Sequence, residues 1–358
     1  MASSETADVL VVGAGVFGLS VARACRAVGL SVLVADRDGP GAGASGGPVG
    51  ALTPHMPRPM TPFKALQRDA LRSLEGHARA LEAETGLPTG YVRSGRMMPV
   101  GSEALRAEAP ALAEAARAAW GGAGLAWQAA PPPGTLAPEA CPHGVFVDDI
   151  SARIDPPAYL AALAASVGAE ALRPGWALTG LAGDRARFDR GVLSAGHVVL
   201  AAGWESFALA GVEGGGVKGQ AALLDATLPP GMPVVQGRGL FVTAHGPGRV
   251  GVGSTHERDW TEPGPDAGLD ALLARAAALV PALAGARVLR RWAGLRPRSA
   301  SGQLLVGPVP ERPGLILATG GYRIGLALAH EIGRAVAARI AGVPGPALPG
   351  SIAPGAPA

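Results

Sequence analysis

The chain has 358 residues, of which 48% are hydrophobic and 16% are charged. This composition excludes a polar disordered chain, and the length predicts two lobes rather than one compact core. The net charge of +3 is carried by scattered residues, so charge gives no sign of a nucleic-acid-binding surface.

The N-terminal residues, MASSETAD, are polar and acidic, which does not fit a secretory signal, and no long uncharged apolar run follows them. We therefore expect a cytoplasmic protein without a membrane span. Cys25 and Cys141 lie too far apart for a metal-ligand motif, and neither has a histidine nearby. The sequence predicts no metal site.

The chain begins with a strand, a tight turn and a helix. The apolar run DVLVV at 8–12 leads into three glycines, and apolar residues then recur at helical spacing up to Gly29. A second apolar strand, SVLVAD, ends at Asp36. This order of elements predicts a βαβ unit.

Gly13, Gly15 and Gly18 form a GxGxxG motif inside this unit. The first glycine permits the tight turn, the second lets a pyrophosphate approach the helix N-terminus, and the third allows close packing of helix and strand. Asp36 can accept hydrogen bonds from both hydroxyls of the adenosine ribose and disfavours a 2′-phosphate. The motif therefore predicts FAD or NAD rather than NADP.

The later elements alternate between helices and strands. Residues 40–60 are rich in glycine and proline and are expected to form loops, and residues 63–85 form a helix that ends at Gly86. The segment 217–260 contains three strands with turn signals between them, which suits an antiparallel sheet. A strand, GLILATG, and a long helix from Ile324 to Ile340 come last.

Several motifs together resemble the D-amino-acid oxidase family of flavoproteins, and within it the glycine oxidases. They are the GxGxxG turn with its terminal acid, GASG at 43–46, VVLAAG at 198–203, WAGLRP at 292–297 and ATGGYRIGLALA at 318–329. The likeness runs from the first strand to about Gly342, and residues 100–140 match least.

The resemblance implies an α/β fold with a Rossmann-type FAD-binding domain, of the kind called GR2 or DAO-like, and a second domain built on an antiparallel β-sheet that binds the substrate. We expect the FAD-binding domain to comprise 1–86, 141–215 and 291–342, and the substrate-binding domain 87–140 and 216–290. The segment 343–358, rich in proline and glycine, is expected to be a flexible tail.

The expected cofactor is FAD, held without a covalent bond because the region around WAGLRPRSASGQ has no cysteine. The motif and the resemblance together give the expected FAD-binding residues. They are Gly13, Gly15, Val16, Phe17, Gly18, Asp36, Arg37, Ala44, Ser45, Val49, Gly50, Ala51, Ala177, Gly203, Gly321, Tyr322, Arg323, Ile324, Gly325, Leu326 and Ala327.

The resemblance also implies that Arg296 and Arg323 hold the carboxylate of the substrate. A guanidinium suits this role because its planar fork can form two parallel hydrogen bonds with a carboxylate. Phe241 stands where glycine oxidases have a substrate-side tyrosine, and Gly321 stands where they have a histidine, so a larger or N-substituted amino acid is open as the substrate. His55, in the loop on the flavin side, is a further candidate for ligand contact or a surface residue.

The chemistry implied is oxidation of an amine. Hydride leaves the α-carbon of a small amino acid for flavin N5, and the resulting imine hydrolyses to a 2-oxo acid. We assign no catalytic side chain, because placement over the flavin is the main requirement. The N-terminus of the last helix is expected to stabilise the reduced flavin.

Two alternatives stay open. One is a flavin domain that acts on carboxymethylaminomethyl-uridine in tRNA, although the absence of a basic cluster disfavours nucleic acid as a partner. The other is a flavin subunit of a multi-subunit amino-acid or opine dehydrogenase. The sequence leaves the electron acceptor, oxygen or another, and the oligomeric state undetermined.

Overall fold

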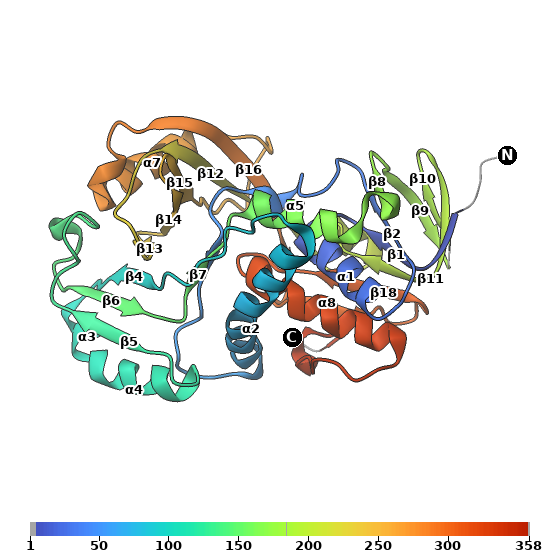
Figure 1. Ribbon diagram of the computed structural model, residues 1–358, viewed down its shortest axis with the longest axis horizontal. Helices are drawn as coiled ribbons and strands as arrows, with labels where there is room; N and C mark the ends of the chain where they lie inside the picture. The colour runs from blue at the N-terminus through green and yellow to red at the C-terminus, as the bar shows by residue number, and fades with distance from the viewer. Residues whose placement is uncertain (1–4, 184, 357–358) are drawn as a thin grey trace.

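In the computed structural model, which describes residues 5–183 and 185–356, the chain forms two lobes side by side (Figure 1). Each lobe contains an eight-stranded sheet. The N- and C-terminal parts of the chain both belong to the lobe on the right of Figure 1. Two lobes are what the chain length predicted.

The first sheet is mainly parallel. Its central strand β1 (Glu5–Val12) lies between β11 (Gly191–Leu200) and β2 (Val32–Asp36). Parallel pairing continues outward to β18 (Leu315–Thr319) on one side and β8 (Leu172–Pro174) on the other. The antiparallel strands are β17 (Leu305–Pro308), β10 (Arg185–Phe188) and β9 (Leu178–Ala182). The carboxyl ends of β1, β2, β11 and β18 therefore meet at one edge.

Helices α1 (Val16–Ala27), α8 (Gly325–Ala341), α5 (Pro156–Val167) and α2 (Pro62–Thr85) pack together beside this sheet (Figure 1). Helices α1 and α8 approach closely because Gly333 has no side chain: a Cβ there would lie 2.4 Å from the carbonyl oxygen of Ser20. Cys25 is fully buried in this layer, and burial raises the pKa of its thiol to about 12. It is a packing residue.

The second sheet is antiparallel except where β13 (Val234–Gly237) runs parallel to β4 (Arg96–Pro99). Its strand order begins with β16 (Arg287–Ser299), β12 (Gly214–Asp225), β15 (Arg249–Gly253) and β14 (Leu240–Gly246), and after β13 and β4 ends with β6 (Val145–Asp148) and β5 (Leu125–Gln128). Helix α7 (Ala267–Leu279) packs against β12, β14 and β15. The remaining helices are α3 (Glu103–Ala107), α4 (Ala109–Ala119) and α6 (Glu205–Ala210), and a short pair joins β3 (Ala51–Leu52) to β7 (Ala152–Arg153).

The expected fold class is confirmed, and several elements lie where the sequence predicted them. The first βαβ unit is present, and α2 ends at Gly86, which adopts the left-handed conformation with φ of 70°. Glycine reaches this conformation without the steric cost that a Cβ imposes.

Several segments differ from the expected domain boundaries. Residues 145–148 (β6) and 291–299 (the end of β16) belong to the second sheet, although we expected both in the FAD-binding domain. The reason for β16 is its pairing with β12 along nearly the whole strand, from Asp225 opposite Arg287 to Gly214 opposite Ser299. The segment expected to be a flexible tail packs on the first lobe at one point, because Ile352 is fully buried in its core. Residues 357–358 lie outside the described residues.

Among the residues that the structure describes, none of the helices has both the length and the apolar character needed to cross a lipid bilayer.

Candidate active site

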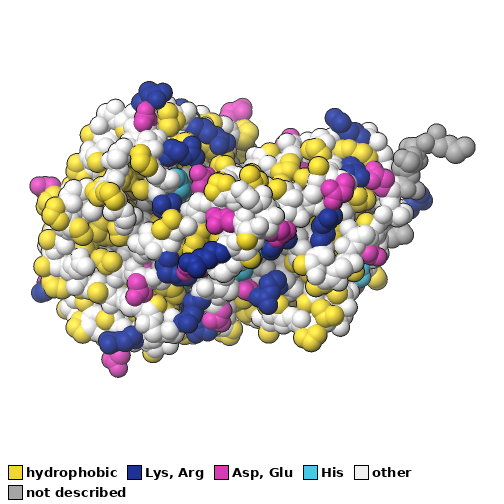
Figure 2. All heavy atoms as spheres, in the orientation of Figure 1, with side chains coloured by type: hydrophobic (Ala, Val, Ile, Leu, Met, Phe, Trp, Pro, Cys, Tyr) yellow, Lys and Arg dark blue, Asp and Glu magenta, His cyan; other side chains and the backbone are white. Residues whose placement is uncertain are grey.

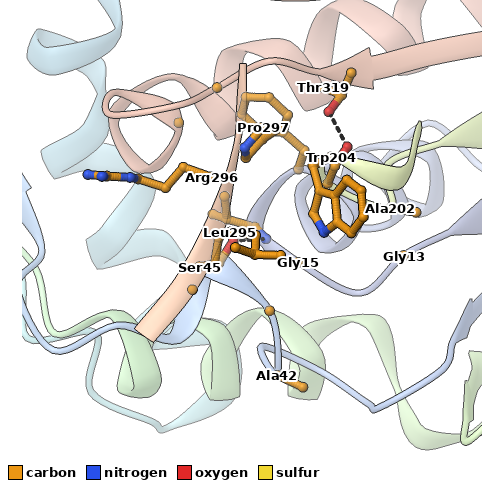
Figure 3. A pocket seen from close by; sticks show the side chains of 18 of the residues that line it. Gly13, Gly15, Ala42, Ser45, Ala202, Trp204, Leu295, Arg296, Pro297 and Thr319 are labelled. Carbon is orange, nitrogen blue, oxygen red and sulfur yellow. Dashed lines mark hydrogen bonds between the residues drawn. The ribbon is translucent and has the colours of Figure 1, made fainter. Parts of the chain in front are cut away.

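A cavity of about 810 Å³ lies between the two sheets and contains both the glycine turn and Arg296 (Figure 3). The first lobe contributes the carboxyl ends of β1, β2, β11 and β18, and the second lobe contributes β12, β14 and β16. Its size is in the range of cofactor and ligand sites. Parallel sheets bind ligands at this edge.

The glycine turn is built for close approach of a ligand to the backbone. Gly13 has φ of 108°, and a Cβ there would lie 2.4 Å from the carbonyl oxygen of Ala201. The Ser45 hydroxyl accepts a hydrogen bond from the backbone N–H of Val16 at 3.1 Å. The backbone N–H groups of Gly15 and Phe17 have no protein acceptor among the described residues. The start of α1 is therefore suited to an anionic group such as a pyrophosphate.

Asp36 joins the end of β2 to this turn. One carboxylate oxygen accepts the N–H of Ala14 at 2.7 Å, and the other accepts the N–H groups of Asp38 at 2.8 Å and Gly39 at 2.7 Å. The carboxylate also lines the cavity. It is thus fixed where an adenosine ribose lies in nucleotide-binding sheets. The residues present fit a dinucleotide cofactor.

Most of the expected FAD-binding residues line this one cavity: Gly13, Gly15, Val16, Phe17, Asp36, Arg37, Ala44, Ser45, Val49, Gly50, Ala51, Ala177, Gly203, Gly321, Tyr322, Arg323, Gly325 and Leu326. Gly18, Ile324 and Ala327 do not line it. Gly18 instead lets α1 pack on the turn, since a Cβ there would lie 1.8 Å from the carbonyl oxygen of Gly13. Ala327 is buried within α8.

Sequence reasoning missed the large aromatic lining of the cavity, which includes Trp176, Trp204 and Trp292. Trp292 fits because its neighbours are small: a Cβ at Gly294 would lie 2.5 Å from the indole, and one at Gly47 would lie 3.0 Å from it. Trp292 opens the motif WAGLRP, and Trp204 directly follows the motif VVLAAG. Their place in or next to these motifs was the available signal.

Arg296 comes from β16 and extends away from Gly13 and Trp204 (Figure 3). Only 8% of this residue is exposed. Its Nη1 donates to the Ser254 hydroxyl at 2.8 Å, and its Nη2 donates to the carbonyl oxygens of Thr255 at 2.6 Å and Lys218 at 3.2 Å. None of these acceptors is charged, and Nε has no partner.

Burial lowers the pKa of Arg296 to about 10, so the guanidinium stays charged at neutral pH. Gly219 makes room for it, because a Cβ at that glycine would lie 2.5 Å from Cζ of Arg296. The Tyr322 ring lies beside the same group, with its centroid 5.3 Å from Cζ. A buried cation without a counter-ion is costly, so this geometry suits a ligand carboxylate.

The other expected substrate residues divide into two groups. Arg323, which is exposed, and Phe241 line the cavity together with Arg296. His55 does not line it. Its backbone N–H and its Nδ1 contact the side-chain oxygen of Gln67 on α2, and the residue is exposed. His55 thus contacts α2 rather than the cavity, which favours the surface role that was left open for it beside ligand contact.

Gly321 has a physical explanation in this chain. A Cβ at Gly321 would lie 2.8 Å from the Phe17 ring, so the aromatic side chain of α1 occupies the space that a side chain at 321 needs. Phe17 also lines the cavity. A side chain at position 321 is therefore incompatible with Phe17 in its present position.

Two histidines lie near the cavity without lining it. His245 Nε2 lies 2.8 Å from the carbonyl oxygen of Pro48, and burial lowers the pKa of His245. His256 contacts the Tyr322 hydroxyl through Nδ1, and desolvation followed by the charge of Arg296 lowers the pKa of His256. Both rings are therefore neutral at neutral pH, and neither reaches the cavity as a base.

Comparison with known proteins gives a consistent result. The family described as FAD dependent oxidoreductase, DAO, matches residues 8–339. A glycine oxidase of Pseudomonas putida is 42% identical over 147 residues, which are 39% of this chain and 40% of that protein. A glycine oxidase of Geobacillus kaustophilus is 29% identical over 352 residues, which are 92% of each chain.

Solved structures share the fold. The crystal structure of glycine oxidase from Geobacillus kaustophilus superposes with a TM-score of 0.86 at 24% identity, covering 95% of this chain and 96% of that one. The iminodiacetate oxidase from Chelativorans sp. BNC1 gives a TM-score of 0.82 at 21% identity, covering 97% and 98%. The chain thus has the same two-lobed architecture over almost its full length.

Proposed function

The chain belongs to the DAO family of FAD-dependent oxidoreductases, and on this premise we propose that it oxidises the amine of a small amino acid. Its cofactor is FAD. The chain spans about two fifths of the length of the Pseudomonas putida glycine oxidase that it matches. The reaction is therefore inferred from the site of this chain together with its family.

One observation carries the proposal: Arg296 is a buried cation without a carboxylate partner, and it lines the same cavity as the glycine turn. The cavity thus offers an anion site at its substrate end and a dinucleotide site at its other end. A ligand carboxylate at Arg296 gains charge-assisted hydrogen bonds in a site shielded from water. Amino acids supply such a carboxylate next to the amine.

FAD, when bound, supplies the two-electron acceptor for the amine. We propose that it is held without a covalent bond, with its pyrophosphate at the N–H groups of Gly15 and Phe17 and its ribose at Asp36. Gly325 and Leu326 line the cavity at the start of α8, where the positive end of the helix dipole favours negative charge.

The residues of the chain orient the substrate and set its protonation state. Arg296, with Arg323 beside it, fixes the carboxylate and thereby the α-carbon and its amine. The same cations favour the neutral amine over the ammonium form, because a second positive charge in the cavity is repelled. A neutral amine has the lone pair that forms the C=N bond as the α-hydrogen leaves with its electron pair. No side chain has to act as a base.

The experiment is an anaerobic titration of the purified yellow protein with glycine, sarcosine, D-proline, D-alanine and an opine, followed by the loss of flavin absorbance. We expect at least one of these amino acids to bleach the flavin. Ethylamine, which has no carboxylate, is the matched control and is expected to leave the flavin oxidised. Bleaching by none of the panel rules the proposal out.

The same titration addresses the alternative of a flavin subunit that needs a partner, because that alternative predicts no bleaching with the isolated chain. The tRNA alternative predicts tight binding that weakens with salt. On the face shown in Figure 2, lysine and arginine side chains are interspersed with acidic and hydrophobic ones rather than gathered into one patch. This distribution gives the tRNA alternative no support on that face.

A further inference from the structure

A second pair of arginines lies beside the substrate end of the cavity. Arg298 follows Arg296 on β16 by two residues, so both side chains leave the same face of the strand, roughly 7 Å apart at their bases. Arg298 and Arg258 line a smaller hollow of about 270 Å³. Its other walls are Gly214, Gly215, Gly216, Val217, Ser299 and Ala300. The two hollows are neighbours along one strand.

Tyr322 connects the two arginine sites. The centroid of its ring is 5.3 Å from Cζ of Arg296 and 5.9 Å from Cζ of Arg298. Both guanidinium groups therefore lie beside a single aromatic ring. A small molecule bound at Arg296 is therefore close to Arg298, which lies two residues further along β16.

These arginines lack the acidic partners that two other arginines of β16, Arg287 and Arg291, have. Arg287 pairs with Asp225 at 2.8 Å and Arg291 pairs with Asp270 at 2.6 Å. Among the described residues, the arginines at positions 258, 296, 298 and 323 form no ion pair with a carboxylate.

The acidic group that acts on Arg296 is Glu257, and its oxygens are already engaged. Its Oε2 lies 3.5 Å from Nζ of Lys218, and its Oε1 accepts from the side-chain amide of Gln220 at 2.9 Å. The exposed acids Asp259 and Glu262 belong to the same loop and form no ion pair with these arginines in the described part of the chain. The positive charge is thus available to an anion.

We propose that the occupant of the cavity is an amino acid with two carboxylates, one held by Arg296 and the other by Arg298 with Arg258. That the occupant is an amine rests on the proposed function, whereas the second anion site rests on the arginines alone. The wall formed by Gly214, Gly215 and Gly216 has no side chains, which leaves room for the second carboxylate. The second carboxylate belongs either to an N-carboxyalkyl group or to an acidic side chain.

The test compares iminodiacetate with its monoamide, which has the same shape and one negative charge less. We expect kcat/KM to be at least about tenfold higher for the dianion, because a charged hydrogen bond contributes roughly 1.5–3 kcal/mol. D-aspartate against D-asparagine and D-glutamate against D-glutamine show whether a side-chain carboxylate has the same effect. Equal rates for every pair overturn the two-carboxylate proposal while amine oxidation stands.

Variants assign the effect to the second hollow. Arg298→Gln and Arg258→Gln are expected to reduce the dianion-to-monoamide ratio of kcat/KM by about tenfold. The control is Arg290→Gln, an exposed arginine on the same strand that lines neither hollow, and it should keep the wild-type ratio. A ratio that falls equally in all three variants indicates a general charge effect and contradicts the proposal.

A binding measurement separates failure of this proposal from failure of the proposed function. Succinate and its half-amide, succinamate, are not amines, and their binding can be followed by calorimetry with the FAD-loaded protein. Tighter binding of succinate that is lost in Arg298→Gln supports the two-carboxylate site even if no amine is oxidised. Equal binding of the two compounds, together with no oxidation of any amine, rules out both proposals.

Discussion

Arg96 and Arg296 are both buried on strands of the second sheet, yet their surroundings differ. Arg96 on β4 is 2% exposed and donates to Asp148 at 2.7 Å and to Gln236 at 2.7 Å. Arg296 on β16 is 8% exposed and donates only to a hydroxyl and two carbonyl oxygens. Each has one nitrogen without a partner, so an unsatisfied nitrogen does not distinguish them.

The presence of a counter-ion distinguishes the two arginines. A buried charge that the fold neutralises holds the structure together, because removing one partner leaves the other buried and unpaired. A buried charge that the fold leaves unpaired, on the wall of a cavity, is neutralised by a ligand instead. We therefore expect Arg96 to be a structural group and propose Arg296 as a ligand-binding group, and the experiments on these two arginines test that difference.

The largest effect is expected for Arg96→Met. Asp148, whose side chain is fully buried, loses its counter-ion, and we expect the free energy of unfolding to fall by about 3–5 kcal/mol. Urea denaturation measures this change. The matched variant is Arg296→Met, which leaves no carboxylate unpaired and is expected to unfold at nearly the wild-type urea concentration.

A double variant checks the cause. Arg96→Met combined with Asp148→Leu removes both charges, and most of the lost stability should return, since a well-packed apolar pair often replaces a buried ion pair without loss. If the double variant is as unstable as Arg96→Met, loss of packing rather than an unpaired charge explains the result.

The next effect concerns the ligand. Arg296→Ala should retain FAD while the KM for the amino acid rises roughly 10²-fold, which corresponds to about 2–4 kcal/mol for a lost charged hydrogen-bond pair. Arg296→Lys is expected to recover only part of this loss, because an ammonium cannot form the two-pronged contact. Steady-state kinetics and the flavin absorbance measure the two properties separately. An unaltered KM in Arg296→Ala moves the carboxylate site elsewhere.

The difference between local and distant contacts explains what the sequence could predict. The turn from Gly13 to Asp36 is one continuous βαβ segment, so its residues predict their own arrangement. Arg96 and Asp148 are separated by 52 residues, and nothing near either one indicates the other. The pair was not predicted, and neither was the membership of β6 in the second sheet, because both depend on pairing between distant strands.

The substrate end shows the same limit. Arg296 was predicted through the motif WAGLRP. The need for glycine at position 219 was not predicted, because it comes from the guanidinium of Arg296 on the neighbouring strand. His55 was left open between ligand contact and a surface role because it lies in the loop on the flavin side, and its contact with Gln67 on α2 favours the surface role. A sequence gives the chemistry of a side chain more readily than the direction in which a loop carries it.

A third buried group extends the comparison to the first lobe. The ring centroids of His77 on α2 and His330 on α8 lie 4.9 Å apart. His330 is 4% exposed, and its Nδ1 has no hydrogen-bond partner among the described residues. Burial lowers the pKa of both rings to about 3, so both are neutral. Neither lines the cavity, so this cluster is expected to affect stability but not substrate binding.

The sign of the pH effect follows from these pKa values. Between pH 3 and the ordinary histidine pKa of 6.5, the unfolded chain binds more protons at these rings than the folded chain does. The contribution of the two rings to the free energy of unfolding is therefore complete above about pH 6.5. It is lost as the pH falls toward 3, by up to about 1.4 kcal/mol per pH unit for each ring.

Urea denaturation at pH 7, 6 and 5 measures that slope. His330→Gln and His77→Gln should each make the slope shallower, whereas His55→Gln, which changes an exposed ring, should not. If stability changes with pH to the same extent in the wild-type protein and in all three variants, groups other than His77 and His330 cause the acid sensitivity.

The smallest effect tests whether the space around Arg296 matters as well as its charge. Gly219 lies on β12 opposite Gly294. A Cβ at Gly219 would lie 2.5 Å from Cζ of Arg296, so the guanidinium of Arg296 has to move in the Gly219→Ala variant. Because the charge is kept and only its position changes, we expect KM to rise about tenfold, or about 1.4 kcal/mol, with stability close to wild type. Gly180→Ala on β9, where a Cβ meets nothing within 4 Å, is the control. A wild-type KM in Gly219→Ala shows that Arg296 can bind the substrate carboxylate from more than one side-chain position. In that case only the positive charge of Arg296 matters, and its exact placement does not.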